Sequence, residues 1–173
     1  DLHSFPTRRS SDLVVVDGDK LLGVVDVTLP NLTPLKETSK GAGIAGEFET
    51  RAVGHYGPLK LQMTWRRATS QAHLLVNPEG KALEIRGAGQ VIDSDTYKFG
   101  ISSIRIVVRA SGSDMQPGKF DPATAMGTTT EVECLYLKVE EDGKVLHEID
   151  KLNFKAVING VDELTEVKSA LGE

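Results

Sequence analysis

Residues 59–66, Leu59-Lys-Leu-Gln-Met-Thr-Trp-Arg66, alternate apolar and polar side chains without a break. Successive side chains of an extended chain point to opposite faces, so the four apolar residues share one face and the four polar residues share the other. The apolar set is Leu59, Leu61, Met63 and Trp65. This stretch therefore predicts a β-strand with one face in a hydrophobic core.

Period-two alternation continues on both sides of this stretch, and Gly, Asn and Asp residues separate the runs. The further predicted strands cover residues 21–29, 82–92, 101–110, 130–139 and 144–158. Asp17-Gly18 and Asp142-Gly143 have the composition of tight hairpin turns. In the last run the apolar phase changes near Asp150 and Lys151, and a β-bulge there is our interpretation. The pattern predicts a mainly β fold built as an antiparallel meander.

Two short segments predict helices. Ser70 is the predicted N-cap of a helix over residues 71–76. Asp162 is the predicted N-cap of a second helix over residues 163–171. We expect an apolar stripe of this second helix to lie against a sheet. The stripe consists of Leu164, Val167 and Leu171.

The segment from residue 30 to residue 46 differs from the strands because it carries two prolines and three glycines with few apolar residues. It predicts a long irregular excursion from the sheet. Its glycines at 41–46 match the GxGxxG string, which in a dinucleotide fold follows a buried strand and opens a helix. Here a polar run precedes the string and residues 47–53 are strand-like. We therefore expect flexible loop glycines and no bound cofactor.

Candidate catalytic and metal-binding residues are few and scattered. Cys134, the only cysteine, lies within an alternating run, which favours a small buried side chain over an activated thiol. His55, His73 and His147 share no recognisable spacing with Cys134 or with paired carboxylates. Asp93-Ser94-Asp95 lacks the later glycine and carboxylate of a calcium loop, so it favours a turn. We expect no catalytic residue, no cofactor and no metal site, and hence not an enzyme.

Length and charge restrict the class of protein. A chain of 173 residues suits one domain with a sizeable core. Its net charge of −5 argues against a dedicated nucleic-acid binder, which normally carries a basic face, although transient contact with DNA stays possible. No apolar run approaches the roughly 18 to 20 residues that span a bilayer, and no signal segment opens the chain. We expect a soluble protein that is not exported.

The first thirteen residues differ from the rest of the chain. Residues 1–13 have no periodicity and resemble the translation of a common sequencing adapter, so we leave them out of the fold prediction. A disordered native arm is the alternative. The expected organisation is a non-native or disordered segment over 1–13 and a single domain over 14–173, whose native N-terminus is missing.

Charged residues share faces on two predicted strands. Arg105 and Arg109 share one face, as do Glu131 and Glu133. Cross-strand ion pairing explains this pattern, and exposed pairs contribute only tenths of a kcal/mol to about 1 kcal/mol. The alternative is that a polar sheet face lines a channel or a subunit contact. The sequence does not separate the two.

Two stretches carry specific motifs: residues 27–47, with Leu-Pro-Asn-Leu-Thr leading into the glycine-rich segment, and residues 148–164, with Ile-Asn-Gly-Val-Asp leading into the last helix. In order and spacing these stretches resemble the major tail tube proteins of contractile-tailed phages and phage-tail-like particles. The likeness is collinear from about Val15 to Gly172, and the middle is looser. It implies an antiparallel β-sandwich or barrel with a short flanking helix and a long loop containing Gly and Pro.

The resemblance also implies a function. It predicts a virion structural protein, encoded by a phage or prophage, that self-assembles into hexameric rings; the rings stack into the inner tube of a contractile tail and conduct DNA during ejection. The implied partners are further copies of the chain, the sheath, baseplate and tape-measure proteins, and transient non-specific DNA in the lumen. A negative lumen would repel phosphate. The implied location is the virion tail, made and assembled in the bacterial host cytoplasm, with no membrane insertion by the subunit.

The long loop is the segment that we expect to contact a neighbouring subunit. The residues assigned to this contact are Leu32, Thr33, Lys36, Lys40, Gly41, Gly43 and Gly46. Two alternatives stay open. The tube of a phage-tail-like bacteriocin or secretion injector shares the fold and carries no genome. A monomeric β-sandwich binding module would need a concave apolar or aromatic site, although only 5% of the residues are aromatic.

Overall fold

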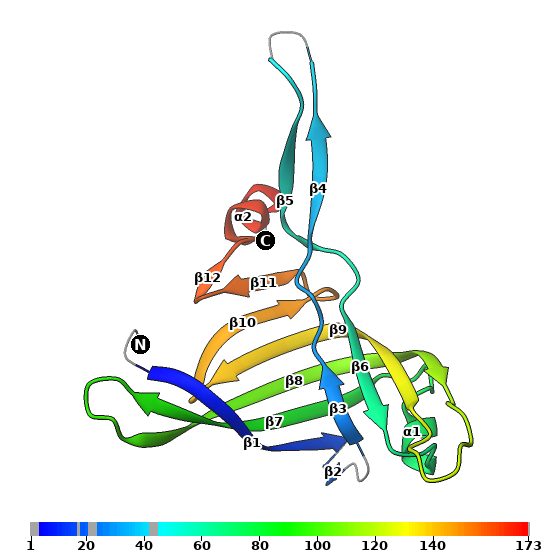
Figure 1. Ribbon diagram of the computed structural model, residues 1–173. Coiled ribbons are helices and arrows are strands. Elements are labelled where there is room, and N and C mark those ends of the chain that lie inside the picture. Colours follow the sequence, from blue (N-terminus) through cyan, green and yellow to red (C-terminus); the bar gives the residue numbers. More distant parts are fainter. Residues whose placement is uncertain (1–3, 17, 21–23, 42–44, 173) are drawn as a thin grey trace.

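The computed structural model describes residues 4–16, 18–20, 24–41 and 45–172, and Figure 1 shows them as one strongly curved sheet with a projecting hairpin. The strands of the main sheet are β1 (Ser4–Val16), β2 (Asp19–Lys20), β3 (Val24–Thr28), β6 (Lys60–Trp65), β7 (Lys81–Asp93), β8 (Phe99–Gln116), β9 (Thr128–Glu141), β10 (Lys144–Asp150), β11 (Lys155–Ile158) and β12 (Val161–Asp162). The hairpin consists of β4 (Pro34–Ser39) and β5 (Phe48–Tyr56), and the helices are α1 (Ser70–Leu74) and α2 (Thr165–Leu171). The mainly β fold is confirmed.

Every pairing among the described strands is antiparallel, and most join strands that follow one another in the chain. The order is β12-β11-β10-β9-β8-β7-β1-β2, with β3 and β6 off this path. The long strand β9 has β8 along one edge, while its other edge pairs with β6 over residues 128–133 and with β10 over residues 136–141. Because two strands share that edge, β6 and β3 turn away and cross the curved sheet (Figure 1).

The core lies between β6 and the strands that it crosses. Leu59, Leu61 and Met63 are fully buried and Trp65 is 1% exposed, so the alternation of residues 59–66 predicted the buried face correctly. Their partners come from β7 to β10 and from the segment around α1. These partners are Ala72, Leu75, Leu83, Ile85, Ile106, Val108, Ala110, Val132, Cys134, Leu137 and Ile149. Two layers of one curved sheet thus enclose a single apolar core.

The N-caps of both helices lie one or two residues away from the predicted caps. Thr69, not Ser70, caps α1, because its side chain accepts a hydrogen bond from Ala72 N at 3.3 Å. Asp162 lies two residues too early to cap α2, and its Oδ1 accepts from Leu164 N at 3.0 Å instead. The predicted stripe is correct only at its start, since Leu164 is 2% exposed and Leu171 is 68% exposed.

The change of apolar phase near Asp150 is a chain reversal, so the predicted bulge was wrong. Residues 151–154 form the turn between β10 and β11. Asp150 Oδ1 accepts hydrogen bonds from Leu152 N at 3.1 Å and Asn153 N at 3.0 Å, which is the geometry of an Asx turn. A turn resets the side-chain phase as a bulge would, and alternation alone does not distinguish them.

Residues 4–13, which we left out of the fold prediction, lie within β1 in the structure. β1 runs antiparallel to β7 with two register shifts, between Pro6 and Arg8 and between Arg9 and Ser11. A strand in this position covers the edge of β7, which would otherwise be open. That the segment is not native stays a prediction.

Candidate functional site: the arm and the polar face of the sheet

The β4–β5 hairpin, termed the arm, projects from the sheet (Figure 1). It forms a two-stranded sheet of its own, with a register that runs from Lys36 opposite Arg51 to Ser39 opposite Phe48. The predicted excursion is confirmed, but the segment is regular and not an irregular loop. An isolated two-stranded hairpin is marginally stable in water, so the arm depends on its base and on whatever covers it.

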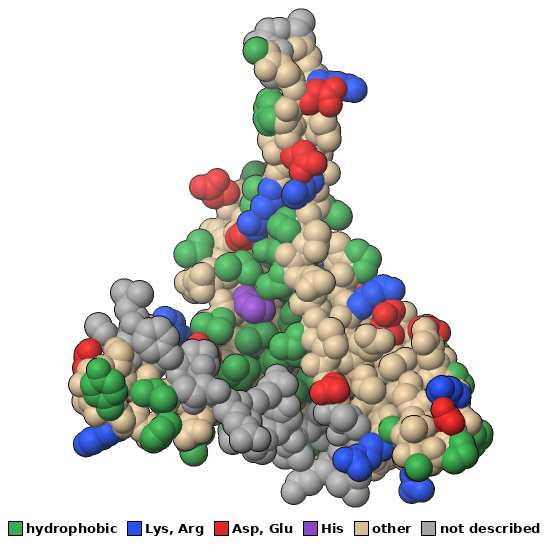
Figure 2. Space-filling view, in the orientation of Figure 1, with side chains coloured by type: hydrophobic (Ala, Val, Ile, Leu, Met, Phe, Trp, Pro, Cys, Tyr) green, Lys and Arg blue, Asp and Glu red, His purple; other side chains and the backbone are tan. Residues whose placement is uncertain are grey.

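The two faces of the arm differ in chemistry. On one face Lys36 Nζ lies 2.8 Å from Glu49 Oε2, and Lys40 Nζ lies 3.5 Å from Glu47 Oε1. Alternation along the strands places Leu35 and Phe48 on the opposite face, where they are 51% and 48% exposed. Figure 2 shows the charged side chains spaced along the arm and grouped at its base. Exposed apolar side chains on a projecting hairpin are typical of an interaction surface.

The base of the arm is held by the C-terminal part of the chain. Arg51 Nη2 donates to Glu163 Oε1 and, at 3.0 Å, to Tyr56 Oη. Tyr56 Oη in turn donates to Glu163 Oε2 at 3.1 Å. The pKa of Arg51 is raised, first by its hydrogen bond to Glu163. We term these three residues the latch, and their geometry fixes the arm to the turn that precedes α2.

A second set of contacts secures the strand exit below the latch. Gly57 N donates to Thr33 O at 2.9 Å. This hydrogen bond joins the segment that enters the arm to the segment that leaves it. Lys151 Nζ donates to Gly57 O at 3.0 Å and to Glu133 Oε1 at 3.1 Å. The ring of His55 meets Phe154 edge-on, with centroids 6.0 Å apart. The angle of the arm is therefore set by residues 151–164.

Loss of the latch should loosen the arm without unfolding the sheet. We expect Glu163→Gln to lower the free energy of unfolding by about 1 kcal/mol or less, because Arg51 is largely exposed. Amide exchange in residues 48–56 should become faster, since the arm has few other contacts. Glu166→Gln, on an exposed position of α2, is the matched control. Equal exchange in the two variants would contradict a positioning role for Glu163.

The residues assigned from sequence to a subunit contact lie in or beside the arm, with one exception. Lys36, Lys40, Gly41 and Gly46 belong to β4 or flank the tip, and Thr33 lies at the base. Leu32 instead packs against the hydrophobic core. The remaining residue, Gly43, lies outside the described residues. The apolar pair Leu35 and Phe48 was missed, because residues 34–39 show no apolar and polar alternation that would indicate a strand.

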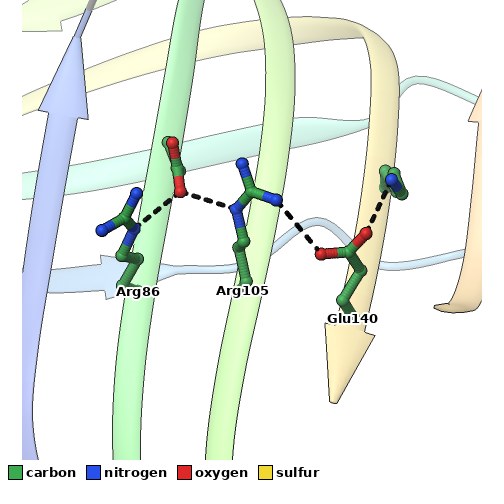
Figure 3. Close-up of polar contacts among 5 residues, drawn as sticks. Arg86, Arg105 and Glu140 are labelled. Atoms are coloured by element: carbon green, nitrogen blue, oxygen red, sulfur yellow. Dashed lines mark hydrogen bonds and ion pairs between the residues drawn. The ribbon is translucent and has the colours of Figure 1, made fainter. Parts of the chain in front are cut away.

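The polar face of the main sheet carries a row of ion pairs across β7, β8 and β9 (Figure 3). Glu84 Oε1 accepts from Arg86 Nε and Arg105 Nε, both at 2.6 Å. Glu140 lies 3.4 Å from Arg105 Nη1 and 2.6 Å from Lys138 Nζ. Cross-strand pairing thus occurs as expected for Arg105, but its partners are Glu84 and Glu140. Glu131 and Glu133 pair with Lys60 and Lys151 instead.

The row predicts a pH dependence of stability. Hydrogen bonds from Arg105 and then Arg86 lower the pKa of Glu84 from 4.5 to about 2. A depressed carboxyl pKa stabilises the fold fully above pH 4.5 and stops doing so as the pH falls toward 2. We expect Glu84→Gln to lower the free energy of unfolding by about 1 kcal/mol at pH 6 and to change it little at pH 2. Urea unfolding at the two pH values measures the difference. Glu79→Gln, a substitution at an exposed residue, should have the same free energy of unfolding as the wild type at both pH values. An equal loss in Glu79→Gln and Glu84→Gln would refute the role of Glu84 in the pH dependence.

The residues weighed from sequence as catalytic or metal-binding candidates include Cys134 and the segment from Asp93 to Asp95. Cys134 is fully buried, and burial raises the pKa of its thiol to about 12, as expected for a structural side chain. Among the described residues, no group of three His, Cys, Asp or Glu side chains lies where it would hold a metal ion. Asp93 Oδ1 accepts from Asp95 N and Thr96 N, which confirms the turn. In those same residues, no helix has the length and hydrophobicity needed to cross a membrane.

Comparison with known proteins identifies the family of the chain. A protein-family model, phage tail tube protein FII, matches residues 12–172. The tail tube protein of Escherichia phage P2 is 27% identical over 172 residues, covering 98% of this chain and 99% of that protein. The class defined by this match is the structural tail tube proteins of phages. The chain belongs to the phage tail tube protein FII family.

A solved structure supports the fold independently. The sheath/tube terminator of an extracellular contractile injection system, in the extended state, superposes with a TM-score of 0.54. The match covers 79% of this chain and 97% of that chain at 9% sequence identity. At this identity the likeness shows the fold alone. It supports the mainly β, antiparallel architecture predicted from the alternation.

Proposed function

We propose that this chain forms hexameric rings that stack into the inner tube of a contractile phage tail, through which DNA passes during ejection. The observation that carries the proposal is the arm: a hairpin with the exposed apolar side chains Leu35 and Phe48, fixed in direction by the latch, on a member of a tail tube family. A surface held ready for a partner binds with less ordering cost than a free loop.

The edges of the sheet also favour a closed ring. Within the described residues, β2 pairs with β1 only at Val15 and Val16, and β3 pairs only with β6, so most of β1 and one edge of β3 lack a second strand. Open strand edges bind other strands, and pairing between neighbours around a ring satisfies them. Oligomerisation would therefore complete hydrogen bonding that the isolated subunit leaves to water.

The proposed subunit contact is the arm and its base. We keep Leu32, Thr33, Lys36, Lys40, Gly41, Gly43 and Gly46 as proposed contact residues, and we add Leu35 and Phe48. The proposed partners are further copies of the chain, a surrounding sheath, and baseplate and tape-measure proteins. Assembly would take place in the host cytoplasm. The net charge of −5 supports transient, weak contact with DNA.

The tube of a phage-tail-like bacteriocin or injector is the second candidate. It would use the same fold, which the injection-system component shares, and it would carry no genome. Particles purified from the producing cell and treated with nuclease distinguish the two. DNA protected inside the particle supports the phage tail, and particles without DNA support the injector.

Electron microscopy of the purified protein tests the proposal. We expect rings and stacked tubes at high protein concentration, together with a solution mass that is a multiple of six subunits. The protein lacking residues 1–13 and a version with a restored native N-terminus are both needed, because residues 1–13 are the segment predicted not to be native. A strictly monomeric protein in all three forms would refute the tube and favour a binding module.

A further inference from the structure

The long strands end in two sets of loops at opposite ends of the sheet. End A consists of residues 66–80 and 117–127, which lead from β6 to β7 and from β8 to β9. End B consists of residues 93–101 and 141–144, where β7 turns into β8 and β9 turns into β10. β7 has 13 residues, so at about 3.3 Å per residue the two ends lie roughly 40 Å apart.

Both ends expose large apolar side chains. At end A these are Leu74, Val76 and Phe120, which are 57%, 37% and 93% exposed. At end B they are Tyr97, Phe99 and Ile101, which are 81%, 68% and 76% exposed. None of these six residues belongs to the core cluster of the described chain. Grouped exposed apolar side chains mark contact surfaces, and here there are two of them facing in opposite directions.

Phe120 is exposed on a loop that is itself fixed. Lys119 N donates to Met126 O at 3.0 Å, and Thr128 Oγ1 donates to Pro117 O at 2.7 Å. Gly118 has a φ of +84°, and a Cβ there would collide with the backbone of Met126. The loop thus holds an aromatic ring in solvent at a defined place, as binding anchors are held.

The charges of the two ends are complementary. End A has the cations Arg66, Arg67 and Lys119 against the anions Glu79 and Asp121, a net charge of +1. End B has the anions Asp93, Asp95, Glu141 and Asp142 against the cations Lys98 and Lys144, a net charge of −2. Opposite charge at two apolar surfaces of one chain fits contact between copies, because it favours A-to-B contacts over A-to-A and B-to-B contacts.

We propose that end A of one copy binds end B of a second copy and that this contact stacks one ring on the next. The inference rests on the proposed function, since strands of a closed barrel tilt by about 35–45° from its axis and so direct their ends to the two rims of the ring. Phe120 enters the apolar surface of Tyr97, Phe99 and Ile101, and Arg66 and Arg67 face the acidic turns. The arm and the latch are separate from this contact.

The test is Phe120→Asp in the full chain, scored by electron microscopy and sedimentation. The side chain is 93% exposed, so the monomer should keep its melting temperature. Rings should form as in the wild type, while the concentration needed for stacked tubes rises about 30-fold, the effect of losing one interface hot spot. Phe120→Leu should restore stacking in part. Leu171→Asp, on α2 away from both ends, is the control and should stack normally.

The outcomes separate this inference from the proposed function. If the wild type forms neither rings nor tubes, the tube itself is refuted and the inference falls with it. If Phe120→Asp forms tubes at the wild-type concentration, only the end-to-end contact is refuted. If it forms single subunits and no rings, Phe120 lies in the contact within a ring, and the inference is wrong.

A charge exchange tests the electrostatic part. Arg66→Glu with Arg67→Glu should weaken stacking, and adding Asp95→Arg with Glu141→Arg to the same chain should recover it. Raising the salt concentration should reduce the difference between these variants, because exposed charges are screened. If the quadruple variant does not stack better than the double variant, the proposed pairing of end A with end B is wrong.

Discussion

Trp65→Ala will lower the free energy of unfolding by about 3–5 kcal/mol, as the removal of a buried aromatic side chain does. Trp65 is 1% exposed and lies at the end of β6, next to Met63 in the core and opposite Thr128 of β9. Its removal leaves a cavity that neighbouring strands cannot fill, because β6 is held by β3 on one side and β9 on the other. Urea unfolding measures the change.

Trp65→Phe separates the packing of the ring from its hydrogen bonding. Among the described residues, Trp65 Nε1 is buried without a hydrogen-bond partner. Replacement by Phe therefore removes side-chain volume but no hydrogen bond. We expect the free energy of unfolding to fall by less than half of the decrease caused by Trp65→Ala. Phe120→Ala, a change at an exposed aromatic residue, should be neutral within about 0.5 kcal/mol. A loss with Phe equal to that with Ala would show that Nε1 has a partner in solution.

The strands were predictable where one face is buried and one is polar. Residues 59–66, 82–92 and 130–139 fulfil this condition; β7 and β9 extend the last two runs, and β6 covers residues 60–65 of the first. Predicted ends were less accurate. β8 runs to Gln116, six residues beyond the predicted run, because β9 supplies partners for residues whose own pattern is mixed. Pairing in the folded sheet, not local propensity, sets such boundaries.

The candidate site was predictable as a segment and not as a structure. The composition of residues 30–46 indicated a departure from the sheet, yet the hairpin forms by pairing with residues 48–56. The latch joins Arg51 to Glu163, which are 112 residues apart. No local pattern carries such a contact. The amphipathic character of the arm emerges only when both strands and their register are known.

Gly54→Ala will detach the base of the arm, and it is the substitution for which we expect the largest loss of assembly. Gly54 has a φ of +69°, which costs an L-residue about 1–2 kcal/mol. A Cβ at this position would also overlap two side-chain carbons of Leu164, which is 2% exposed and has little room to move. We expect the free energy of unfolding to fall by about 2–4 kcal/mol in total. Urea unfolding and electron microscopy of the tubes measure the two effects.

Two comparisons isolate the contact with Leu164 from the backbone strain. Gly160→Ala has a φ of +81° and no atom within 4 Å of the added Cβ, so it should show the strain alone and still assemble. In a Leu164→Ala background the overlapping carbons are gone, and Gly54→Ala should cost only the same strain. If Gly54→Ala lowers the free energy of unfolding as much in the Leu164→Ala background as in the wild type, the close approach to Leu164 does not position the arm.

Loss of tubes in Gly54→Ala, with rings and tubes retained in Gly160→Ala, would make the direction of the arm a condition for assembly. The physical reason is that a displaced arm must be reordered during binding, at a cost of about 0.5–1.5 kcal/mol for each side chain immobilised. With several arm side chains in each of many repeated contacts, even a modest cost per contact prevents growth of a polymer. Normal tubes from Gly54→Ala would assign assembly to the sheet edges and ends, without the arm.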